Sequence, residues 1–515
     1  MPTENIPNPA TTSSDYDDMI AYWSMVSTIL GGVPSMKENA PLYLPKFPEE
    51  TQELYNLRAE SIVMTNIYRD IVENLASKPF SKKVRFVEDK ASDGVKTLSE
   101  DIDGRGNNLH VFLSETFFNG INKAVDWIFV DKAPLREGVT VAEEKSLGAR
   151  PYWVHIPAEK LLAVYSDIVN GKEEIVHARI SEPEIMRQGW GEIYINRVRV
   201  LNREPVINAE GKTIGYGPAT WEVWEEKTEV KGQGTTSQAT VWKQISSGLI
   251  AIKVIALVPF ITGRRIGKGW IFEPPMKDAA FAQLDHYQQE NGKKDARVMT
   301  AYPMLVGSGV TQPKDDHGTP IRVPVGPRTT LFAPMSSEGK AGDWKWIEPA
   351  ALSLTWLSSE LKAKEDQIRE LGRQPLTAQS GNLTVIMAGV AAAKGNTAVQ
   401  AWTFGLKDAA EQAFIYTAMY MNTSEEPEVW IHTDFPVEGT AEKAPDLVIK
   451  LRENKEISRD AMFEELKRFN IISPDYDPEA DAEKIAEEEP DDPTAEDIKA
   501  ALGNQEVVPP IRVVK

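Results

Sequence analysis

Apolar residues recur at helical spacing between Leu352 and Leu371, with charged residues between them. This period predicts one long helix with an apolar stripe. A second run, residues 383–421, is rich in alanine and other apolar residues and predicts another long helix. Its small side chains would let a neighbouring helix approach closely.

A polar loop, residues 372–382, joins these two runs. Pro375 lacks a backbone N–H and disfavours a helical conformation at Gln374, and glycines stand at both ends of the loop. The pattern suits a chain that packs beside copies of itself and offers the loop to a partner. It also fits a helical hairpin inside a large core, and the pattern alone favours this second interpretation while leaving both open.

In the first half of the chain, segments with the helical spacing of apolar residues are followed by segments with the pattern of β-strands. Helical spacing of apolar residues predicts helices at residues 16–30, 49–77 and 109–130, with an extended segment at 41–45. From residue 150 onward, β-branched and aromatic residues separated by turn signals predict strands within residues 152–157, 192–201, 220–226, 239–245 and 249–258. Together these elements predict an α+β fold with an antiparallel sheet.

The second half begins with a predicted helix at residues 276–300, followed by a β-like segment rich in proline and glycine up to residue 347. That segment lies between two predicted helices, each long enough to carry it roughly 30 Å away. A short strand near residue 430 and helices at 446–453 and 458–469 follow, with Ser458 as an N-cap.

Composition narrows the possibilities. A chain of 515 residues predicts several domains, and the absence of long apolar runs predicts no membrane span. Without cysteine there is no disulfide or thiolate chemistry.

The charge of the chain is strongly negative. The net charge of −20 disfavours tight, static binding to nucleic acid. Residues 475–497 carry twelve carboxylates against Lys484 alone, which predicts a solvated tail. The polar residues 1–14 predict a mobile arm.

Catalytic and metal-binding motifs are weak. Residues 263–269 are glycine-rich and basic, but the spacing is one residue short of a phosphate loop, so we interpret them as a basic turn at the foot of a helix. Residues 475–486 resemble a calcium loop, but Ala480 stands where such a loop needs glycine and Ala486 where it needs glutamate. The six histidines form no metal-binding spacing. We therefore expect no cofactor and no metal. Carboxylates that pair only in the folded chain leave a hydrolytic activity open at this point, whereas the resemblance described next implies that the chain is not an enzyme.

Short motifs in a fixed order carry a more specific signal. They are Tyr43-Leu44-Pro45, Glu49 with Tyr55, Arg58 and Asn66, Phe129-Val130-Asp131 with Pro134, Arg150-Pro151-Tyr152-Trp153, Val258-Pro259-Phe260, Pro274-Pro275, Leu284 to Gln288, Gly307, Glu370-Leu371-Gly372, Asp434-Phe435 and Glu465-Leu466-Lys467-Arg468. Over residues 40–490 the chain resembles portal proteins of tailed bacteriophages. It departs from them at the loop, where Thr377 and Ala378 follow Pro375 after a shortened approach.

The resemblance implies a homo-oligomeric ring, typically of twelve subunits, at one capsid vertex of the virion, assembled in the host cytoplasm. Double-stranded DNA would pass through the ring without sequence readout. The implied partners are the terminase large subunit, the major capsid protein and neck proteins. The implied regions are a wing at 15–262, stem helices at 263–300 and 351–371, a clip at 301–350, a tunnel loop at 372–382, a long wing or crown helix at 383–425, a crown at 426–473 and an acidic tail at 474–515.

The resemblance also implies site residues. Candidates for the channel are the tunnel-loop residues Arg373, Gln374, Thr377, Gln379 and Asn382, and the basic stem residues Arg264, Arg265, Lys268, Lys362 and Lys364. Two other functions stay open. A head–tail adaptor predicts a ring that does not bind terminase, whereas a carboxylate-based hydrolase predicts a monomer or small oligomer with measurable activity.

Overall fold

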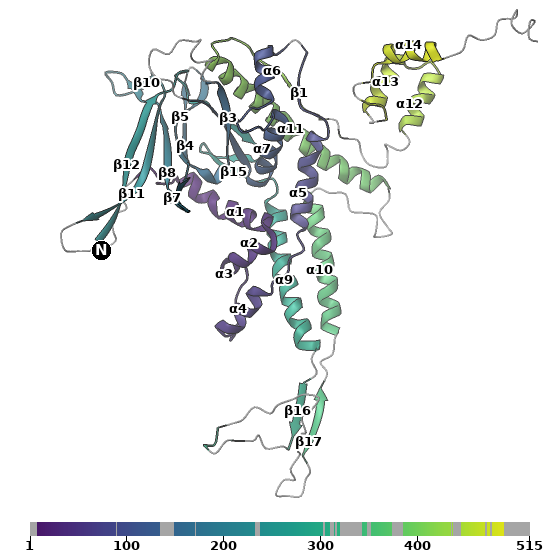
Figure 1. The fold of residues 1–515 in the computed structure, drawn as a ribbon. Helices are drawn as coiled ribbons and strands as arrows, with labels where there is room; N and C mark the ends of the chain where they lie inside the picture. Colours follow the sequence, from purple (N-terminus) through teal and green to yellow (C-terminus); the bar gives the residue numbers. More distant parts are fainter. Residues whose placement is uncertain are drawn as a thin grey trace, which may run out of the picture. The chain divides into compact units, whose positions relative to one another are not determined.

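A computed structural model describes most of the chain. The described residues are 8–88, 90–133, 149–169, 171–231, 237–301, 304–309, 314, 317–319, 342–347, 352–372, 385–433, 435, 444–468, 471–473 and 476–488. The chain divides into two compact units, residues 1–433 and 434–515. Each unit is described by itself. Helices and antiparallel sheets are combined, as the sequence predicted (Figure 1).

Short helices open the first unit. They are α1 (Ser14–Leu30), α2 (Gly32–Glu38), α3 (Ala40–Tyr43), α4 (Gln52–Glu60), α5 (Ile67–Ser77), η1 (Lys78–Phe80), α6 (Asp93–Ser99) and α7 (Leu109–Lys123). The prediction of α1 is confirmed. The predicted extended segment at 41–45 is wrong over α3, and the single helix predicted at 49–77 is two helices separated by residues 61–66.

The predicted arm is shorter than residues 1–14. Ser13 is buried, its backbone N–H donates to the carbonyl of Leu162, and its hydroxyl accepts from the N–H of Tyr16 at 3.2 Å. Ser13 therefore caps α1 and holds the chain against the body. Residues 1–7 lie outside the described part.

A three-stranded sheet forms the centre of the first unit, in the order β13 (Leu257–Ile261), β2 (Val125–Lys132), β3 (Pro151–Ile156). Helix α7 and a later helix, α11 (Val385–Tyr420), pack against it. Trp127, Trp153 and Phe260 are almost fully buried there. The helix predicted at 109–130 is wrong beyond Lys123, because Ala124 adopts a left-handed backbone conformation (φ 74°) that ends α7 and starts β2.

A second, five-stranded antiparallel sheet has the order β12-β11-β8-β5-β4. Its strands are β4 (Leu161–Val169), β5 (Lys172–Ser181), β8 (Arg197–Asn202), β11 (Thr220–Lys231) and β12 (Ser237–Leu249), with η2 (Ala158–Lys160) before β4. Four two-stranded pairs lie around the sheets: β6 (Glu184–Gln188) with β7 (Gly191–Ile195), β9 (Pro205–Ile207) with β10 (Thr213–Tyr216), β14 (Arg264–Ile266) with β15 (Ile271–Glu273), and β1 (Arg85–Phe86) with β18 (Val429–Trp430).

Two long helices follow these sheets in the chain. Helix α9 (Lys277–Ala301) and helix α10 (Leu352–Leu371) lie side by side in opposite directions (Figure 1). Between them in sequence, β16 (Met304–Ser308) and β17 (Asp343–Ile347) pair antiparallel. The bounds predicted for α10 are confirmed to the residue. Residues 264–273, expected within the first stem helix, form the β14–β15 hairpin instead.

The second unit contains α12 (Ala444–Glu453), α13 (Arg459–Arg468) and α14 (Pro478–Glu488). The N-cap prediction is confirmed, since the Ser458 hydroxyl accepts from the N–H of Ala461 at 3.1 Å. Helix α14 lies within the acidic tail predicted from residue 474, and its described side chains are exposed or half-buried. Proline at its first position and acidic residues in its first turn both favour a helix start there.

Candidate functional site

Helix α9 holds the linker between α4 and α5 by side-chain hydrogen bonds. The Gln283 carbonyl oxygen accepts from the N–H groups of Ile67 and Tyr68, each at 3.0 Å, and its amide donates to the Thr65 carbonyl at 2.9 Å. Those two N–H groups belong to the first turn of α5 and have no partner inside the helix. One buried glutamine therefore starts α5 and fixes α9 against it.

Glu290 and Asn291, about two helical turns after Gln283 on α9, also bind the linker. The Asn291 side chain accepts from the N–H of Val63 at 3.0 Å and donates to the carbonyl of the same residue at 2.9 Å. Glu290 accepts from both the backbone N–H and the hydroxyl of Thr65, at 2.9 and 2.8 Å. These bonds pin residues 61–66 to α9, and they explain why α4 and α5 are separate helices.

Helix α10 packs along α9 through its apolar stripe. Leu361 and Ile368 are buried, and Lys364 pairs with Asp285 of α9 at 2.8 Å. At the end of α10, Arg369 lies 3.4 Å from Asp70 of α5. The C-terminal end of α10 is thereby anchored to α5.

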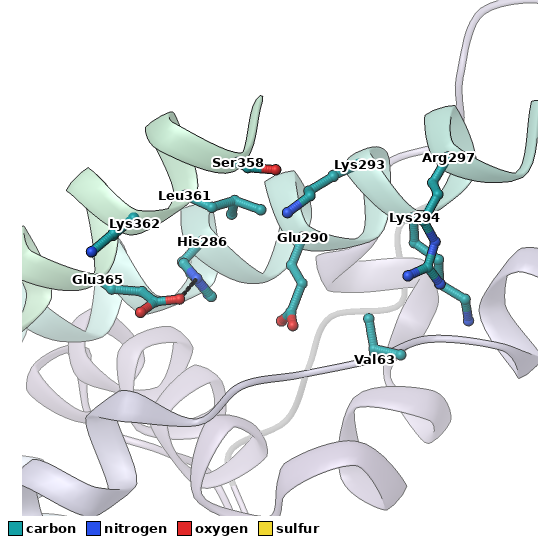
Figure 2. Close-up of a pocket in the computed structure, with 10 residues that line it drawn as sticks. All are labelled: Val63, His286, Glu290, Lys293, Lys294, Arg297, Ser358, Leu361, Lys362 and Glu365. Atoms are coloured by element: carbon teal, nitrogen blue, oxygen red, sulfur yellow. Dashed lines mark ion pairs between the residues drawn. The ribbon is translucent and has the colours of Figure 1, made fainter. Parts of the chain in front are cut away.

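A hollow of about 490 Å³ lies between α9 and α10 (Figure 2). Val63 of the α4–α5 linker borders it, and the other lining residues are His286, Glu290, Lys293, Lys294 and Arg297 of α9, with Ser358, Leu361, Lys362 and Glu365 of α10. Four lysine and arginine side chains thus face two carboxylates. The cationic side chains outnumber the carboxylates, so the hollow has a net basic character in a chain whose net charge is −20.

His286 lies at the buried side of this hollow with only 1% of its surface exposed. Neither ring nitrogen has a hydrogen-bond partner among the described residues. The closest carboxylate oxygen, on Glu365, is 3.6 Å from Nε2, too far for a hydrogen bond (Figure 2). A buried imidazole without a hydrogen bond lowers the stability of the fold. A group that enters the hollow and bonds to the ring would offset this cost.

Three of the predicted basic stem residues lie outside the helices. Arg264 pairs with Glu273 at 2.8 Å, and Arg265 makes a two-pronged pair with Glu173, both bonds at 2.7 Å. The hydrogen bond from Arg265 lowers the pKa of Glu173 to about 2. Lys268 is exposed in the turn between β14 and β15. The interpretation of residues 263–269 as a basic turn before a helix agrees with this hairpin.

The other predicted site residues divide into two groups. Lys362 is exposed at the hollow, whereas Lys364 is engaged with Asp285. Arg373, Gln374, Thr377, Gln379 and Asn382 lie outside the described residues. Sequence reasoning missed Lys293, Lys294 and Arg297, because basic residues in a polar helix resemble an ordinary solvated face. Their spacing over one turn was the only available signal.

A buried carboxylate–imidazole pair occurs elsewhere, on β2 and β3. Asp126 is fully buried, and burial raises its pKa. His155 Nε2 contacts an Asp126 carboxylate oxygen, and Nδ1 lies 3.7 Å from Glu115. Burial acts to lower the pKa of His155, but the Asp126 charge outweighs it and the pKa is raised. The pair links the central strand β2 to the edge strand β3 of the three-stranded sheet.

Two further properties of the described part of the chain bear on function. Within it, histidine and carboxylate side chains nowhere cluster in threes in a way that could hold a metal ion. None of its helices is long and apolar enough to cross a membrane. What the helix pair offers chemically is a basic hollow that suits a negatively charged group.

A family model described as a domain of unknown function, DUF4055, matches residues 275–421. That range begins just before α9 and ends just after α11, so it contains the helix pair, β16, β17 and the small-residue helix. No curated protein matches the chain.

Solved structures show a low-scoring likeness to components of gene transfer agent (GTA) particles. One chain, from the neck of a native GTA particle computed with C12 symmetry, is 11% identical, covers 77% of this chain and 88% of its own, and has a TM-score of 0.38. A chain from the virion of a native GTA particle is 11% identical, with coverages of 85% and 96% and a TM-score of 0.38. A third, from the neck of an empty particle computed with C6 symmetry, is 11% identical, with coverages of 83% and 96% and a TM-score of 0.39.

Proposed function

We propose that this chain is the subunit of a portal ring at one capsid vertex of a tailed bacteriophage or phage-like particle. The observation that carries the proposal is the unit formed by α9, β16, β17 and α10. Two long antiparallel helices enclose a separate, strand-containing segment in sequence. This order corresponds to the stem, clip and second stem helix implied by the sequence resemblance.

Three further features support this function. Helix α11 has 36 residues rich in small side chains, and Phe414 and Thr417 near its end contact Trp153 of the three-stranded sheet. Arg264 and Arg265 pair with Glu273 and Glu173, which reduces the positive charge that they offer to DNA. The net charge of −20 suits a conduit that repels its cargo. In this role the chain is not itself an enzyme, and the partners are terminase, the capsid protein and neck proteins.

The proposal is tested by measuring assembly and partner binding together. Twelve copies of 57.3 kDa amount to about 690 kDa, a mass that native mass spectrometry resolves from smaller species. We expect rings by negative-stain imaging and capture of the terminase large subunit from the same particle. Monomers or dimers at every concentration would overturn the proposal. A ring that does not bind terminase would identify a head–tail adaptor instead.

A further inference from the structure

Among the described residues, none fills the hollow between α9 and α10, and the opposite side of α10 carries a protrusion formed by Trp356 and Glu360. Trp356 of α10 is 61% exposed, and Glu360, one turn further on, is also exposed. No hydrogen bond, ion pair or ring contact of these two side chains occurs among the described residues. Tryptophan is one of the residues that are enriched in the cores of protein–protein interfaces.

Helix geometry places the protrusion and the hollow on opposite sides of α10. Two residues along an α-helix turn it by about 200°. Trp356 precedes Ser358 by two residues, and Glu360 precedes Lys362 by two, while Ser358 and Lys362 both line the hollow. Trp356 and Glu360 therefore point away from the hollow that their neighbours border.

The two features also lie at the same height along the helix. Two residues of an α-helix rise about 3 Å, so Trp356 and Glu360 stand level with Ser358 and Lys362. In a ring whose axis follows α10, rotation from one subunit to the next conserves height. The protrusion of one subunit then meets the hollow of the next subunit. Such a head-to-tail contact can close into a ring.

The chemistry of the two surfaces is complementary. The hollow has four basic side chains and an unpartnered buried imidazole, together with the apolar side chains of Val63 and Leu361. The protrusion brings one carboxylate and one aromatic ring. A volume of about 490 Å³ is larger than a single inorganic anion needs and suits large side chains.

We propose that the hollow of one subunit receives Trp356 and Glu360 of the next copy of this chain. This inference rests on the ring of the proposed function, and it assigns the contact between neighbouring stem helices. Glu360 lies among the basic side chains and Trp356 against the apolar wall.

Cysteine crosslinking tests this contact directly, because the natural chain contains no cysteine. A double variant, Ser358→Cys with Glu360→Cys, places one thiol on each side of α10, where they cannot meet within one chain. With a short bis-maleimide, assembled rings should give a ladder of covalent oligomers. The two single-cysteine variants are the controls, since a head-to-tail contact cannot link either of them.

Each other result is decisive. Intact rings by native mass spectrometry with no ladder from the double variant would overturn this inference and leave the ring standing. Crosslinked dimers from a single variant would show a two-fold contact and overturn it as well. Protection of Ser358→Cys from maleimide only when duplex DNA is added would assign the hollow to a DNA phosphate instead. Failure to form rings under any condition would overturn the proposed function, and this inference with it.

A charge reversal gives an independent measurement. Glu360→Lys brings a cation to the basic hollow and should raise the subunit concentration for half-assembly at least about tenfold. Glu370→Lys is the matched control, because it makes the same change on an exposed position of α10 that does not adjoin the hollow. Equal effects of the two variants, or none from Glu360→Lys, would overturn the assignment.

Discussion

Gly372 lies so close to Ile71 that a Cβ atom at residue 372 would come within 2.6 Å of the Ile71 Cδ1. Ile71 belongs to α5 and is fully buried, so it has little room to move. The glycine therefore sets how closely the end of α10 approaches α5. Its backbone N–H also closes the last turn of α10, donating to the Ile368 carbonyl at 2.8 Å.

Gly372→Ala should consequently lower the free energy of unfolding by about 1–3 kcal/mol through overpacking. Gly292→Ala is the matched control in α9, since a Cβ there meets no atom within 4 Å. That control should raise the stability by up to about 1 kcal/mol, because alanine favours helix. Urea unfolding of both variants checks the prediction. A neutral result at residue 372 would mean that the packing of α10 on α5 is looser than described.

We expect a larger loss of stability when Gln283 is replaced. It is fully buried and makes three hydrogen bonds to the α4–α5 linker and the start of α5. Gln283→Leu keeps a similar volume but removes the acceptor of the Tyr68 N–H and leaves the Ile67 N–H with only its 3.2 Å bond to the Thr65 carbonyl. We expect a loss of about 2–4 kcal/mol in the free energy of unfolding.

Gln367→Leu is the comparison for this variant, because that glutamine is exposed on α10 and its change should stay within about 0.5 kcal/mol. Hydrogen exchange should also speed up at Ile67 and Tyr68 in Gln283→Leu. Unchanged exchange at those amides would show that Gln283 does not start α5.

The Glu173–Arg265 pair predicts a pH dependence. The folded-state pKa of Glu173 is lowered from 4.5 to about 2, mainly by the hydrogen bond from Arg265. A lowered pKa means stability that is present above pH 4.5 and is lost as the pH falls toward 2. The pair is partly exposed, so after screening by solvent it contributes no more than about 1 kcal/mol.

Glu173→Gln should therefore be less stable than the natural chain at pH 7, and the difference should shrink between pH 4.5 and 2. Glu192→Gln removes a carboxylate that is exposed in β7 and should show no such window. Denaturant midpoints measured across this pH range decide the matter. A difference that grew on acidification would have the wrong sign for this ion pair.

The sequence predicted α10 to the residue because its stripe of leucine and isoleucine is a purely local signal. It predicted one helix at 49–77 because the cause of the break is remote: Gln283 and Asn291 bind the linker from more than 200 positions away. The buried run at 125–130 fits helical and strand patterns alike, and the left-handed Ala124 gives no sequence signal. The basic hollow was missed for a related reason, since it exists only where α9 and α10 meet.

The loop after α10 gives a prediction about the channel. Helix α10 ends at Leu371, and Arg373 follows Gly372 directly. In a ring, one arginine per subunit at this position becomes a circle of cations around the DNA. Each contact with a phosphate in water is weak and is screened by salt, so the circle would steady the duplex without holding it. The alternative role is a local one, in which Arg373 stabilises the carbonyl end of α10 through the helix dipole.

Arg373→Glu separates these two roles. If Arg373 lines the channel, rings should assemble with normal thermal stability while the DNA packaged or retained per head falls. If it caps α10, the ring should melt at a lower temperature and packaging per intact head should be unchanged. Arg105→Glu, at an exposed position before α7, makes the same change in charge and should affect neither quantity. Equal losses of packaging in both variants would trace the effect to net charge alone, and Arg373 would then have no specific place in the channel.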